Sequence, residues 1–143
     1  MKKRIPLFAA LLFIFGCNNT LKPDSSYDYS IEQQRTCYCP LVGEWIRLFV
    51  VNDSVVKAIR SSDNYELTAE ERTWYKSVQE LFTMITETDT ALYDVSFTVD
   101  PDDNYPSYVD FKRKPFVDEN GNITGILMDA DFSYKTRNFT TAD

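Results

Sequence analysis

The clearest periodic pattern in the chain is an apolar stripe that follows Thr68. The segment Thr68-Ala-Glu-Glu71 matches a capping box, in which a hydroxyl and a carboxylate each accept a hydrogen bond from a free N–H at a helix start. The later residues are apolar at helical spacing, at Trp74, Val78, Leu81, Phe82 and Ile85. The pattern predicts one amphipathic helix that packs its stripe on a sheet.

Strand patterns lie on both sides of this stripe. Residues 45–51 and 55–59 are apolar runs separated by Asn52-Asp53-Ser54, a turn-forming sequence that predicts a hairpin. Residues 93–99 alternate apolar and polar side chains, which is typical of a half-buried strand. Two more strands are expected at residues 107–112 and 126–134 on the same grounds. An Asn-Gly turn at residues 118–122 lies between them.

The order of these elements predicts the fold class. Strands precede and follow one helix, and the connections between them are too short for the crossovers that parallel strands need. We therefore expect an α+β fold: an antiparallel β-sheet of about five to six strands with one principal amphipathic helix packed on one face.

The first residues of the chain form a separate segment. Residues 1–4 include three basic side chains, and residues 5–15 are apolar apart from Pro6. This is the pattern of a secretory signal, and it is shorter than the roughly 20 apolar residues that span a bilayer.

The end of that segment resembles a bacterial lipoprotein signal. Ile14 and Gly16 fit the lipobox of such signals, whereas Phe15 is bulkier than the usual residue. The resemblance implies that Cys17 becomes the first residue after cleavage and carries a lipid anchor, since several acyl chains hold a protein on a membrane. An ordinary cleaved signal with an unmodified Cys17 is the alternative.

This interpretation divides the chain into three parts. Residues 1–16 are the lipoprotein signal peptide, residues 17–34 are a flexible tether with a lipidated Cys17, and residues 35–143 are a single α+β domain. The tether has no acidic cluster directly after Cys17, of the kind that resembles surface-export signals. We therefore expect a membrane-anchored protein of the bacterial cell envelope that faces the periplasm.

Charge and composition narrow the function. The chain has 15 basic and 22 acidic residues, and removal of residues 1–16 would leave 12 basic residues and a net charge of −10. A domain this acidic repels phosphate backbones, so we expect no nucleic-acid partner. The chain contains no histidine, which excludes the commonest general base and the Ser-His and Cys-His nucleophile pairs. We expect no catalytic residues, no metal site and no cofactor.

Cys37 and Cys39 are the first candidate site. On a strand, residues two apart point to the same face, with β-carbons farther apart than a relaxed disulfide needs. A bridge would need the backbone to bend, and a strained bridge is easily reduced, as a redox or sensor domain requires. A structural role is favoured, since the only basic neighbour is Arg35.

Carboxylates supply two further candidates. Residues 100–104 resemble the opening of a calcium loop, but Tyr105 and Phe111 stand where that loop needs glycine and glutamate, so a solvated turn is favoured. The outward positions of the predicted strands carry a set of aspartates, at Asp94, Asp110, Asp129 and Asp131. On one sheet face they would form either a docking surface for a basic partner or a solvated face, and the second is favoured.

Several short motifs together resemble one bacterial family. They are Cys37-x-Cys39, Val51-Asn-Asp-x-Val55, Ser77-Val-x-x-Leu-Phe82, Tyr93-Asp94 and Tyr105-Pro106. In this order they are similar to the domain of unknown function 6174, a small secreted or lipid-anchored domain, over roughly residues 36–115. The family pattern commonly has Gly before Tyr-Pro, where this chain has Asn104, a residue that tolerates a positive φ. The resemblance implies no activity, substrate or catalytic residue.

These observations favour a non-catalytic envelope lipoprotein that binds another envelope protein and is held on the membrane through Cys17. A thiol redox or sensor domain that uses Cys37 and Cys39 is one alternative, and a purely structural envelope component is another.

Overall fold

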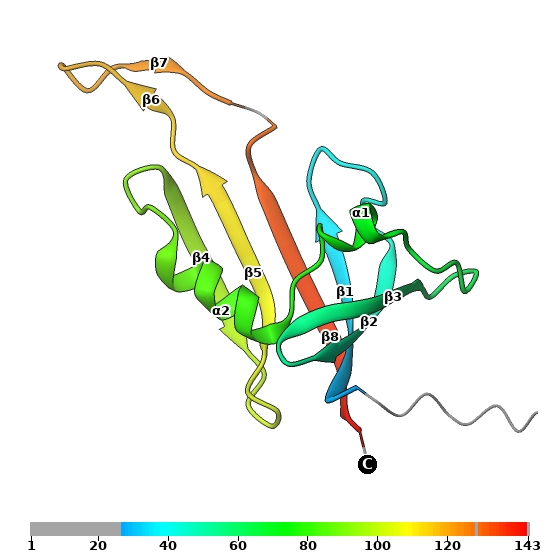
Figure 1. Cartoon of the computed structure of the whole chain (residues 1–143). Helices are drawn as coiled ribbons and strands as arrows, with labels where there is room; N and C mark the ends of the chain where they lie inside the picture. The colour runs from blue at the N-terminus through cyan, green and yellow to red at the C-terminus, as the bar shows by residue number, and fades with distance from the viewer. Residues whose placement is uncertain (1–26, 128, 143) are drawn as a thin grey trace, which may run out of the picture.

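A computed structural model describes residues 27–127 and 129–142 of the chain. These residues form eight strands and two helices (Figure 1). The elements are β1 Tyr29–Thr36, β2 Trp45–Val51, β3 Ser54–Arg60, α1 Ala69–Arg72, α2 Val78–Glu87, β4 Tyr93–Val99, β5 Pro106–Arg113, β6 Phe116–Val117, β7 Ile123–Gly125 and β8 Phe132–Thr141.

Six strands form one antiparallel sheet in the order β3-β2-β1-β8-β5-β4. The last strand of the chain, β8, lies in the middle and joins β1–β3 to β4–β5. Because β1 and β5 both run antiparallel to β8, both finish at the same end of the sheet, which we call the distal end. At the opposite, proximal end, β1 begins and β8 finishes (Figure 1).

The predicted helix is interrupted after its first turn. Helix α1 begins at the expected Thr68–Glu71 capping box but has four residues. A second capping box, between Ser77 and Glu80, begins the ten-residue helix α2. The expected α+β fold with one principal amphipathic helix is therefore wrong, because most of the regular structure is β-strand and both helices are short.

The helices and the segment between them cover one face of the sheet, and we call the other side the open face (Figure 1). Two groups of buried side chains lie on the covered face. The first consists of Ile31, Ile46, Leu48, Ala58, Leu67, Tyr75 and Tyr105. The second, under α2, consists of Leu81, Val109, Phe111 and Tyr134. Leu81 is the buried residue of α2, whereas Trp74 precedes this helix and packs on the first group.

Residues 29–34, which we expected to belong to the tether, form most of β1 and pair with both β2 and β8. Only Ile31 of this stretch is an aliphatic core residue. Gln33 is fully buried, and its side chain bonds the main chain of Lys76 at 2.9 and 3.0 Å. Because these polar groups are paired inside the protein, the strand lacks the apolar signal of its neighbours.

Strands with local signals agree more closely with the sequence analysis. The hairpin predicted around Asn52 and Asp53 is β2–β3, and both residues have positive φ, as a tight hairpin turn requires. The strand predicted at residues 93–99 is β4. The predicted strand at residues 126–134 is wrong in extent, because β8 begins at Phe132 and continues to Thr141.

Candidate functional site

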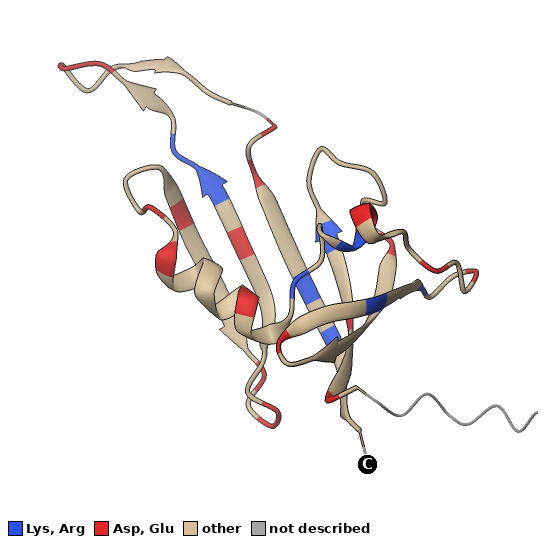
Figure 2. Ribbon diagram, in the orientation of Figure 1, with Lys and Arg blue, Asp and Glu red and all other residues tan. Residues whose placement is uncertain are grey.

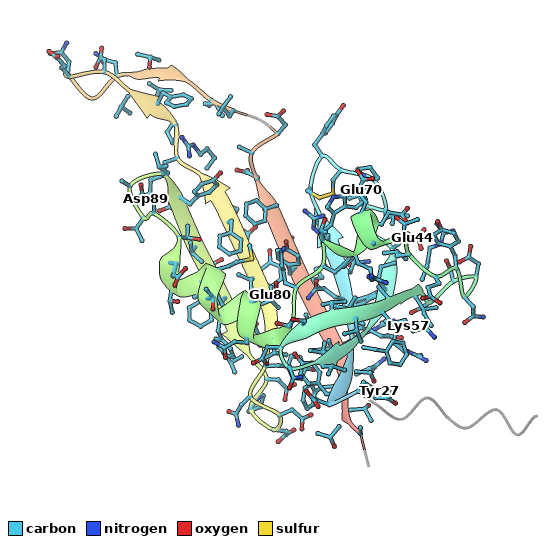
Figure 3. The ribbon with its side chains drawn as sticks, viewed as in Figure 1. Tyr27, Glu44, Lys57, Glu70, Glu80 and Asp89 are labelled. Carbon is cyan, nitrogen blue, oxygen red and sulfur yellow. A yellow bond between two sulfur atoms is a disulfide. The ribbon has the colours of Figure 1, made fainter. Side chains whose placement is uncertain are left out.

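Cys37 and Cys39 form a disulfide in the loop that follows β1 at the distal end (Figure 3). The backbone bends here instead of continuing as a strand, and the two Cα atoms are 5.2 Å apart, within the usual range for a disulfide. The loop closes where the N–H of Gly43 donates to the C=O of Arg35 at 3.0 Å. The bond therefore joins neighbouring parts of one surface loop and connects no two elements of the core.

Reduction of this disulfide is expected to lower the free energy of unfolding by no more than about 1–2 kcal/mol, because a bond between residues only two positions apart restricts the unfolded chain little. Urea unfolding with and without reductant measures the effect. A Cys37→Ser/Cys39→Ser variant should not respond to reductant. Equilibrium reduction by a glutathione buffer would contradict a structural role and favour the redox alternative.

The structure does not place the four predicted aspartates together as one carboxylate surface. Asp94 and Asp110 lie on the open face, where Lys114 and Lys112 pair with them at 3.3 and 3.6 Å. Asp129 and Asp131 lie in the segment before β8, outside the sheet. The carboxylate of Asp131 accepts a hydrogen bond from the N–H of Arg113 at 2.7 Å. Lysines thus partly neutralise the strand carboxylates, and Asp131 fixes the end of β5.

The Asp100–Asn104 segment is a closed turn. One carboxylate oxygen of Asp100 accepts hydrogen bonds from the N–H groups of Asp102 and Asp103 at 3.0 and 3.1 Å. Among residues 27–127 and 129–142, no group of three or more His, Cys, Asp or Glu side chains could hold a metal ion. Cys17, the predicted lipidation site, lies outside the described residues.

A feature that the sequence analysis missed lies at the distal end. Two segments expose large apolar side chains there, the loop after β1 and the β6–β7 hairpin with the two residues that follow it. Tyr38 is 93% exposed, and Ile123 and Ile126 are 64% and 65% exposed. We call the two exposed groups together the distal apolar surface: Phe116, Val117, Ile123, Ile126 and Leu127 in and after the hairpin, and Tyr38 and Val42 in the separate loop after β1. Figure 1 shows the hairpin projecting beyond the six-stranded sheet, with which it shares no ladder.

Specific contacts hold the hairpin in place. The guanidinium of Arg113, at the end of β5, lies 5.1 Å from the ring centre of Tyr93 and 5.5 Å from that of Phe116. At the tip, Asp118 accepts hydrogen bonds from the N–H groups of Asn120 and Asn122 at 2.9 and 2.8 Å. Hydrogen bonds from Asn122, ahead of the others, lower the pKa of Asp118, so the tip is negatively charged at neutral pH.

A buried carboxylate lies on the open face, in the middle of β1. Glu32 is 5% exposed, and its oxygens accept hydrogen bonds from a set of side chains contributed by β2, β8 and the residue after β3. The donors are Arg47 at 3.4 Å, Ser61 at 3.2 Å, Arg137 at 2.9 Å and Asn138 at 2.8 Å. The group is fully paired and ionised, which suits a structural role and not a catalytic acid.

The sequence alone predicts neither the distal apolar surface nor the hydrogen-bond partners of Glu32. Glu32 and Arg137 are 105 positions apart, and no short motif links them. The apolar residues around the Asn-Gly turn are visible in the sequence, but their exposure depends on where α2 lies. Because α2 packs on β4, β5 and β8, the hairpin stays uncovered.

Comparison with known proteins gives one match. The model of a family described as "Family of unknown function (DUF6174)" matches residues 21–140. No curated protein and no solved structure matches the chain. In the described part of the chain, neither helix has the length and apolar character needed to cross a bilayer.

Proposed function

Because the chain belongs to the DUF6174 family, whose function is unknown, we propose its function from its own residues. We infer that it is a lipid-anchored protein of the bacterial cell envelope. Its domain binds another envelope protein through the distal apolar surface and catalyses no reaction.

The observation that supports this binding role most directly is the position of the distal apolar surface relative to the start of the domain. Tyr27 and the beginning of β1 lie at the proximal end (Figure 3). A lipid on Cys17 would therefore attach through the end of the sheet opposite the exposed apolar side chains.

The chemistry of the hairpin supports a binding role. Apolar area in water is unfavourable by about 25 cal/mol per Å², and a partner that covers it recovers this free energy. The contacts of Arg113 and Asp118 already order the hairpin, so binding costs less conformational entropy. The tip carries Asp118 and Glu119, which disfavours an anionic lipid surface and fits an apolar groove with a basic rim on a protein.

A photo-reactive amino acid at position 123 tests the proposal in cells that normally make the protein. We expect irradiation to yield a discrete covalent adduct with one recurrent protein. Val56 is the matched control, because it is also a β-branched strand residue and is 47% exposed. The same label at position 56 should give no such adduct, and a Phe116→Ser/Val117→Ser change should remove the adduct formed at position 123.

Two outcomes would contradict the proposal. A protein that is solitary at both labelled positions has no partner at the distal apolar surface. A Cys17→Ser protein that matures and partitions with membranes like the unchanged chain has no lipid anchor at this position. The first result removes the binding role and the second removes the anchor, so the two parts of the proposal fail separately.

A further inference from the structure

The two edges of the six-stranded sheet differ. At the β3 edge, the N–H of Arg60 donates to the C=O of Tyr65 at 2.8 Å, and the N–H of Leu67 donates to the C=O of Ala58 at 2.9 Å. Residues 65–67 thus cover part of that edge, with a bridge between Ile59 and Glu66. At the other edge, β4 pairs only with β5 in the described part of the chain.

The register shows which groups of β4 are free. The N–H of Lys114 donates to the C=O of Leu92 at 2.9 Å. Hydrogen-bonded pairs recur every second residue in an antiparallel ladder, so Asp94, Ser96 and Thr98 also bond β5. The backbone N–H and C=O groups of Val95 and Phe97 therefore point outward from the sheet.

The side chains of this edge are apolar on the covered face. Tyr93 and Val95 pack on the group of buried residues under α2. Further along the strand, Phe97 is 49% exposed and Val99 is 38% exposed. A seven-residue strand with free backbone groups and exposed apolar side chains is a template for pairing with another strand.

We propose that β4 pairs antiparallel with β4 of a second copy of this chain, about a two-fold axis at Ser96. The backbone N–H and C=O groups of Val95 then form hydrogen bonds with those of Phe97 in the second copy. By symmetry, Phe97 of the first copy bonds Val95 of the second in the same way. On the covered face, Tyr93 meets Val99 and Val95 meets Phe97, so apolar side chains face apolar side chains. On the open face, Asp94 meets Thr98 and never its own symmetry copy, which avoids a like-charge pair.

The charges near the two ends of β4 favour a second copy of this chain as the strand that pairs with the β4 edge. The turn after β4 carries Asp100, Asp102 and Asp103, whereas Lys112, Arg113 and Lys114 lie beside its first residues (Figure 2). Antiparallel pairing brings the acidic turn of each copy toward Lys112, Arg113 and Lys114 of the other, although Lys112 and Lys114 also pair with Asp110 and Asp94 of their own chain. The two sheets would become one sheet with a distal apolar surface at each end.

Cysteine cross-linking of the full chain in its membrane tests this pairing. A Ser96→Cys protein places two cysteines opposite each other at a non-hydrogen-bonded pair, where β-carbons are closest. Mild oxidation is expected to convert it largely to a disulfide-linked dimer. Thr98→Cys is the matched control, on the same strand and face, and should stay monomeric because its counterpart lies four residues further along the ladder. A mixture of Asp94→Cys and Thr98→Cys proteins should cross-link again.

A second change separates pairing from chance collision. Phe97→Lys in the Ser96→Cys background places a charge in the paired apolar face of each copy and should reduce the dimer to the level of the Thr98→Cys control. Equal cross-linking of the Ser96→Cys and Thr98→Cys proteins would overturn the proposal. So would a Ser96→Cys protein that stays monomeric at all protein concentrations, since a single ladder is a small, concentration-dependent interface.

Discussion

Replacement of Phe111 by alanine is expected to lower the free energy of unfolding by about 4 kcal/mol. Phe111 is 0% exposed in the middle of β5. Its ring stacks on that of Phe132, with centres 4.6 Å apart, and it lies in the same buried group as Leu81 of α2. Truncation would leave a cavity where α2, β5 and β8 meet, beneath Leu81, the buried residue of α2.

Urea unfolding followed by circular dichroism measures this change, and Phe116→Ala is its matched control. Phe116 lies only five positions away but is 44% exposed and belongs to the separate β6–β7 hairpin. We expect the control to change the free energy of unfolding by less than about 0.5 kcal/mol. Equal losses in the two variants would mean that the hairpin and the main sheet unfold as one packed unit.

The parts of the fold that sequence predicts well are those with local causes. The β2–β3 hairpin follows from two apolar runs and from Asn52 and Asp53, residues that tolerate the positive φ of the turn. Strand β4 follows from a strict alternation of side chains. In both, the residues that decide the structure are neighbours in the chain.

The errors in the fold have non-local causes, with one exception. Strand β1 is polar in sequence because Gln33 bonds Lys76, 43 positions away, and Glu32 bonds Arg137, 105 positions away. The length of the helix was predictable in principle, since Ser77 and Glu80 have the same capping-box spacing as Thr68 and Glu71. The second helix start is easily missed, because the apolar residues keep helical spacing across the break between α1 and α2.

The candidate site divides in the same way. Cys37 and Cys39 were identified from their spacing, but only the folded chain shows that they lie in a bent loop and are bonded. Exposure of Tyr38 and Ile123 depends on what covers the distal end, and sequence periodicity reports which side chains share a face without reporting what lies above it.

Replacement of Glu32 by glutamine is expected to lower the free energy of unfolding by about 2–3 kcal/mol at pH 7. Removing one member of a buried ion pair typically costs about 3–5 kcal/mol. We expect a smaller loss because the side chains of Arg47 and Arg137 are 56% and 49% exposed, so water screens both cations. Glutamine keeps the size of the side chain but leaves both cations without a counter-charge. Glu66→Gln, which removes a single exposed pair with Lys57 at 3.9 Å, should cost less than about 0.5 kcal/mol.

The dependence on pH shows whether charge causes that loss. Burial alone would raise the pKa of Glu32, but hydrogen bonds from Arg137, Asn138 and Ser61 outweigh burial and lower the pKa below its ordinary value of 4.5. A carboxyl group with a lowered pKa in the folded protein stabilises it above the unfolded pKa, and this stabilisation is lost as the pH falls through the folded pKa. The difference between the unchanged protein and Glu32→Gln should thus be complete at pH 7 and shrink below about pH 4.5. A difference that stays constant in urea unfolding down to about pH 3 would assign the loss to packing, because a charge effect must disappear once Glu32 is protonated.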